Sequence, residues 1–153
     1  VPFQHNGQAV GVDLGLVRPA VASNNQFFGA RRWREVDHRH FRLRRSLQPK
    51  GTPSAKRHLR QLADRVNRFR RDCDHVLSRR IVDAVLPGTT IVVENLTDIR
   101  SRTKEWGRRS NRRLHSWSFA QLRGFLEYKA EGAGCQVAGV DPRHTSQTCS
   151  RCG

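Results

Sequence analysis

The sequence contains no methionine and few aromatic residues, and these scarcities limit what the protein can be. None of its 153 residues is Met, and aromatic side chains make up only 7%. Because a reading frame normally begins with methionine, we expect this sequence to be a piece of a longer protein. It has no run of about 18 apolar residues, so no transmembrane helix is expected, and its first residues lack the pattern of a signal peptide. We therefore expect a cytoplasmic protein that makes no membrane contact.

Acidic residues are also scarce, so the charge is strongly of one sign. The chain has 29 Lys and Arg against 13 Asp and Glu, a net charge of +16. Such a charge predicts a nucleic-acid partner, although a merely solvated basic surface is the alternative. Two segments, 31–45 and 100–113, hold arginines with Trp33, Phe41 and Trp106 among them, and these aromatics either stack on unpaired bases or pack locally. The arginines expected to bind nucleic acid are Arg31, Arg32, Arg42, Arg44, Arg45, Arg108, Arg109, Arg112 and Arg113.

Only two of the four cysteines are close together in the sequence. Cys149 and Cys152 form a CxxC pair, which is typical of half a zinc site or of a redox motif. No βαβ thioredoxin pattern precedes the pair, which argues against redox chemistry. Cys73 falls on the apolar stripe of a predicted helix and Cys135 opens a predicted strand, so both are expected to be core residues. With no secretory signal, a disulfide framework is not expected.

The hydrophobic periodicity predicts an α/β fold. Alternating or β-branched stretches indicate strands within 8–15, 19–23, 26–28, 89–93 and 135–140, with a turn at Asn24 and Asn25. Apolar residues at three- and four-residue spacing predict a long amphipathic helix that begins at Ser54, its expected N-cap, and stops before Pro87. A second helix is predicted over 116–131. Strands alternating with helices indicate a mixed sheet flanked by helices.

Two carboxylates interrupt apolar strands. Asp13 lies between Val12 and Leu14, and Glu94 follows a β-branched run. A carboxylate is costly to bury unless it binds a cation or accepts hydrogen bonds, and hard oxygen ligands suit Mg²⁺ or Mn²⁺. If the two strands are neighbours, both carboxylates project at one end of the sheet. The alternative is an aspartate that caps a strand and a glutamate on the surface.

Three motifs stand out: GVDLG at 11–15, VVENL at 92–96 and VDPRHTSQTCSRCG at 140–153. Together they resemble those of the TnpB/OrfB family of insertion-sequence proteins, which are RuvC-like RNA-guided nucleases related to type V CRISPR effectors. The resemblance implies an RNase H-like (RuvC-like) α/β fold in which Asp13 and Glu94 are catalytic and hold Mg²⁺ or Mn²⁺. It implies that Cys149 and Cys152 are the first knuckle of a zinc ribbon. Asp141 matches no catalytic position.

The resemblance also implies a domain division and a function. Residues 1–140 would be a RuvC-like nuclease domain without its third carboxylate, and 141–153 the first half of a zinc-ribbon insertion that binds Zn²⁺ only in the complete protein. The expected activity is metal-dependent hydrolysis of DNA by an RNA-guided endonuclease, with DNA and guide RNA as partners. This chain alone is expected to be inactive. The alternatives are a non-catalytic basic nucleic-acid-binding module and a transposase relic.

Overall fold

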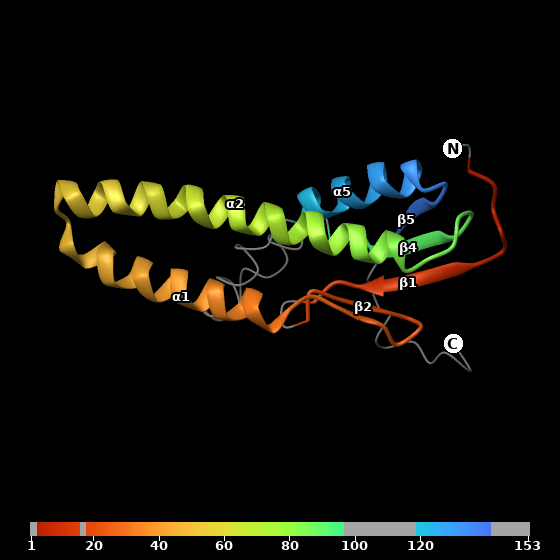
Figure 1. Ribbon diagram of the computed structural model, residues 1–153, viewed down its shortest axis with the longest axis horizontal. Helices are drawn as coiled ribbons and strands as arrows, with labels where there is room; N and C mark the ends of the chain where they lie inside the picture. The colour runs from red at the N-terminus through yellow and green to blue at the C-terminus, as the bar shows by residue number, and fades with distance from the viewer. Residues whose placement is uncertain (1–2, 16–17, 97–118, 142–153) are drawn as a thin grey trace.

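A five-stranded mixed sheet lies towards one end of the elongated molecule (Figure 1). The computed structural model describes residues 3–15, 18–96 and 119–141. The strand order is β3-β2-β1-β4-β5, and β1 runs parallel to β4 and antiparallel to β2. β4 runs parallel to β5, and β2 runs antiparallel to β3. The strands are β1 (Ala9–Asp13), β2 (Ala20–Ala22), β3 (Phe27–Phe28), β4 (Thr90–Glu94) and β5 (Gln136–Val140).

Three α-helices complete the described chain: α1 (Arg31–Leu47), α2 (Pro53–Asp83) and α5 (Phe119–Gly132). A short 3-10 helix, η1 (Gln48–Lys50), joins α1 to α2, and these two helices lie side by side as a long hairpin (Figure 1). The helix α1 was not predicted, because arginines dilute its apolar positions. Helix α1 contacts α2 through an ion pair of 2.9 Å between Arg70 and Asp37 and through the edge-on contact of the His40 ring with the Phe69 ring.

The long helix begins earlier than predicted, and the expected N-cap at Ser54 is wrong. Thr52 is the N-cap: its hydroxyl accepts a hydrogen bond of 3.2 Å from the amide of Ala55. Pro53 follows at the first helical position, where its missing N–H costs nothing. Ser54 therefore lies within the first turn.

The core lies between the sheet and the two helices α2 and α5. Val12, Ile91 and Val93 of the sheet are at most 3% exposed, and they belong to one buried cluster with residues of both helices. Trp33 packs against this cluster. The structure therefore favours local packing of Trp33 over stacking on unpaired bases. The helical members of the cluster include Leu77, Ile81, Leu122 and Leu126.

The two cysteines within the described residues are structural, as expected. Cys135 is buried and Cys73 half-buried, and both thiols are free. Burial, together with the nearby carboxylate of Asp72, raises the pKa of the Cys73 thiol to about 12. A thiol held protonated in this way is a poor nucleophile and a poor metal ligand.

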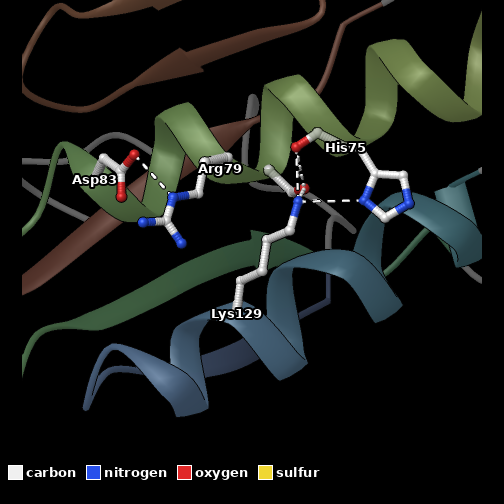
Figure 2. Close-up of polar contacts among 5 residues, drawn as sticks. His75, Arg79, Asp83 and Lys129 are labelled. Carbon is white, nitrogen blue, oxygen red and sulfur yellow. Dashed lines mark hydrogen bonds and ion pairs between the residues drawn. The ribbon is translucent and has the colours of Figure 1, made fainter.

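Polar contacts also join α5 to α2 (Figure 2). The Lys129 ammonium donates hydrogen bonds to the carbonyl of His75 at 2.6 Å and to the hydroxyl of Ser78 at 2.7 Å. The ring of His75 stacks on Phe125 with centroids 3.8 Å apart. These contacts fix α5, and with it the strand β5 that follows, against the rest of the sheet.

None of the helices in the described part of the chain has both the length and the apolar composition that a membrane span requires.

Candidate active site

Asp13 and Glu94 end two neighbouring parallel strands. In the register of β1 and β4, Val12 lies beside Val93, so the next position along each strand places Asp13 beside Glu94. Both carboxylates therefore lie at the carboxyl end of their strands, one strand spacing apart, which is about 4.8 Å. The sequence predicted that the two carboxylates would project at one end of the sheet if their strands were neighbours. The structure shows that β1 and β4 are neighbours.

Both carboxylates project from the face of the sheet opposite the core. Val12 and Val93 are buried against the helices, and successive side chains of a strand point to opposite faces. Asp13 and Glu94 consequently lie on the other face, which we call the outer face. Asp13 is exposed and Glu94 is half-buried.

The electrostatics show that the two groups influence each other. Partial burial raises the pKa of the Glu94 carboxyl, and the neighbouring charge of Asp13 raises it further. Two carboxylates in this arrangement repel each other when both are ionised, and a cation between them removes that repulsion. The pair is therefore an arrangement that a bound cation would stabilise.

The residues present fit a magnesium-type ion in number and chemistry. Mg²⁺ is commonly held by one or two carboxylates and completes its coordination with waters and substrate phosphate. Within residues 3–15, 18–96 and 119–141, no cluster of three or more His, Cys, Asp or Glu side chains could hold a metal. Asp141, which follows β5, therefore does not join the pair as a third ligand.

The arginines predicted to bind nucleic acid divide into two groups. Those of the first group lie on α1, and each is exposed; Arg31 also pairs with Glu35 at 3.2 Å. The second group, the Cys149–Cys152 pair and Trp106 lie outside the described residues. The exposed arginines of α1 are Arg31, Arg32, Arg42, Arg44 and Arg45.

One feature of the outer face was not predicted from the sequence. Phe27 on the edge strand β3 is 61% exposed, and the guanidinium carbon of Arg18 lies 4.5 Å from the centroid of its ring. The adjacent Phe27 and Phe28 could have revealed it, because neighbouring residues of one strand cannot both face the core.

Comparison with known proteins identifies several that are similar to this chain in sequence. A family model described as the TNB domain of Cas12f1-like proteins matches residues 119–153. A CRISPR-associated endodeoxyribonuclease Cas12f1 of Sulfoacidibacillus thermotolerans is 41% identical over 97 residues, which are 62% of this chain and 21% of the relative. A TnpB-like protein of Methanocaldococcus jannaschii is 36% identical over 80 residues, 52% of this chain and 29% of the relative. The chain thus spans between a fifth and a third of these curated relatives.

Solved structures share the fold. A cryo-EM structure of a Cas12f1–sgRNA–target DNA complex matches the whole chain with a TM-score of 0.73 and 22% identity, over 41% of the Cas12f1 chain. A cryo-EM structure of a CRISPR–Cas12f ternary complex matches it with a TM-score of 0.72 and 25% identity, over 33% of that chain. Sheet and helices are therefore arranged as in one region of those proteins.

Proposed function

Because this chain belongs to the TnpB/Cas12f-like family, we propose that it is the RuvC-like, RNase H-fold part of an RNA-guided DNA endonuclease. The observation that carries the proposal is the pair of carboxylates at the ends of β1 and β4. Two acidic side chains from segments 81 positions apart in the sequence (94 minus 13) meet in one row of the sheet. Two carboxylates side by side in one row of the sheet, with a raised pKa at Glu94, are expected for a cation site. A carboxylate that only caps a strand requires neither a second carboxylate beside it nor a raised pKa.

The proposed roles follow from position and charge. Asp13 and Glu94 hold the divalent cation, Mg²⁺ or Mn²⁺, at the carboxyl ends of the strands. Bound there, the cation would neutralise charge that develops on the scissile phosphate and would lower the pKa of an attacking water. Partial burial of Glu94 keeps its carboxylate from being fully solvated by water, which favours a cation as its partner.

The proposed partners are DNA and a guide RNA. The exposed arginines of α1 and the net charge of +16 suit a phosphate backbone, whose contacts carry affinity without reading sequence. Sequence choice would then come from base pairing between guide and target. The solved structures that share the fold support this proposal, since they are a Cas12f1–sgRNA–target DNA complex and a CRISPR–Cas12f ternary complex.

The C-terminal residues have a separate proposed role. We assign residues 1–140 to the nuclease domain and 141–153 to the first half of a zinc ribbon, with Cys149 and Cys152 as ligands. A structural zinc site needs four ligands, so two thiolates would bind Zn²⁺ only with a further pair. The match of the TNB-domain model to 119–153 supports a role for this region in the family's architecture.

Removal of the metal tests the proposed function. With its guide RNA bound, the protein that contains this chain is expected to nick supercoiled target DNA in Mg²⁺, to lose cleavage in excess EDTA, and to recover it when Mg²⁺ or Mn²⁺ is restored. DNA binding should persist in EDTA, because arginines and base pairing supply it. Cleavage that continues in EDTA would exclude a metal-dependent mechanism. Binding without cleavage in either ion would establish the non-catalytic module instead.

A further inference from the structure

The row of the outer face that contains the two carboxylates continues to the edge of the sheet. Asp13 is the register partner of Val21 in β2, and Val21 is the partner of Phe27 in β3. Directly opposed residues of antiparallel strands project from the same face. Phe27 therefore lies on the same face as Asp13 and Glu94 and in line with them.

Phe27 is held in this outward position by its surroundings. Its neighbour Phe28 packs against the core, which leaves Phe27 facing outward. Gly29 has a φ of +123°, and a Cβ at this position would lie 2.7 Å from the ring of Pro19. Gly29 thus allows the end of β3 to approach the start of β2 closely. The ring of Phe27 is therefore presented to solvent from a strand that is paired with β2.

Arg18 gives this aromatic ring a cationic companion. Its guanidinium lies over the ring at 4.5 Å, yet Phe27 is still 61% exposed. Guanidinium groups that stack on aromatic rings present planar N–H donors that suit phosphate. A stacking surface and a phosphate-binding group therefore lie together, on the row of the carboxylates.

The separation matches the dimensions of a nucleic-acid strand. Phe27 and Asp13 are two strand spacings apart, about 10 Å. A strand in B-form geometry advances about 3.4 Å per nucleotide, so this distance corresponds to about three stacked nucleotides and to fewer in an extended single strand. A strand whose phosphate lies at the carboxylates can therefore place a nearby base on Phe27.

We propose that Phe27 and Arg18 form a stacking subsite for an unpaired base of a single DNA strand, a few nucleotides from the phosphate that Asp13 and Glu94 address. The subsite deepens the proposed nuclease function and rests on it. Phe27 and Arg18 act as positioning residues: the ring stacks on the base and the guanidinium contacts the adjoining phosphate. Aromatic stacking tolerates any base, which suits an enzyme whose sequence choice comes from elsewhere.

Binding of two single-stranded probes by the 153-residue chain tests the subsite. One probe is a short DNA strand of mixed sequence, and the other is the same backbone without bases. The unaltered chain is expected to bind the base-bearing strand about five- to tenfold more tightly, the lower part of the range for one stacked base. Phe27→Ala should abolish this preference and leave affinity for the base-free strand unchanged, whereas Phe27→Trp should keep it. Arg18→Gln should lower affinity for both strands and reduce the salt dependence by about one phosphate contact.

A matched control is Leu86→Ala, because Leu86 is 63% exposed but does not belong to the outer row. It should leave the preference intact. The subsite is wrong if Phe27→Ala retains the preference, or if it weakens both strands equally, which would mark Phe27 as structural. In that case metal-dependent cleavage is untouched and the nuclease proposal stands. If the unaltered chain bound neither strand, the nucleic-acid function itself would be wrong.

Discussion

Asp13→Asn or Glu94→Gln is expected to lower DNA cleavage by roughly 10³-fold or more, because each removes one charged ligand of the proposed cation, which would stabilise the transition state. The substitutions keep the shape of the side chains, so the sheet should not be disturbed. Affinity for target DNA should stay close to that of the unaltered protein, since arginines and base pairing supply it. The measurement is a nicking time course in Mg²⁺ beside a binding titration in Ca²⁺, with the protein that contains this chain.

Asp141→Ala is the matched control for this loss. Asp141 is acidic, exposed and located just after β5, but it forms no metal cluster with the pair within the described residues. It should retain substantial cleavage. Near-normal cutting by Asp13→Asn would refute the assignment of the site. Loss of folding and of binding together would show that the aspartate is structural.

Asp74→Asn is expected to stabilise the chain by an amount that grows as the pH rises from about 4 to about 7 and stays constant above that range. Asp74 on α2 is 7% exposed, and burial raises its pKa to about 7, against the opposing influence of Arg70. Because the folded pKa exceeds the unfolded one, ionisation costs stability as pH rises between the two values. A rise of the pKa from its ordinary value of 3.8 to about 7 corresponds to at most about 4 kcal/mol, which is the upper limit of the gain at pH 8. At pH 4 the gain should vanish.

Urea unfolding at several pH values, read as the difference between variant and unaltered chain, measures this effect. The difference removes the contribution of every other titrating group. Asp64→Asn is the control, since Asp64 lies exposed on the same helix. Its difference should be small at each pH. A difference for Asp74→Asn that does not change with pH would mean that the carboxyl titrates normally.

Strong periodicity made most of the sheet and the long helix predictable. The strands around Asp13 and Glu94 were found by alternation and by β-branched residues, and α2 by its apolar stripe. The helix α1 was missed because its apolar residues are separated by arginines that its exposed surface tolerates. Its partner surface on α2, including Arg70 and Phe69, is a tertiary feature that the local sequence of α1 does not contain.

The candidate site was predictable in its residues and only conditionally in its geometry. The predicted strand patterns identified Asp13 and Glu94 as candidate residues, but only the pairing of β1 with β4 brings them together. Likewise Ser54 and Thr52 are both good caps, and the choice between them depends on Pro53, which takes the first helical position. The row that links Phe27 to Asp13 depends on registers between three strands, which no local pattern encodes.

The most direct test of the central claim is an NMR pH titration of the Glu94 carboxyl in this chain. If Asp13 and Glu94 lie side by side, Glu94 should titrate above its ordinary pKa in the absence of metal, because of burial and the charge of Asp13. Asp13→Asn should lower that pKa by removing the like charge, and Mg²⁺ should lower it in the unaltered chain by stabilising the carboxylate. A Glu94 pKa that changes neither with Asp13→Asn nor with Mg²⁺ would contradict the account.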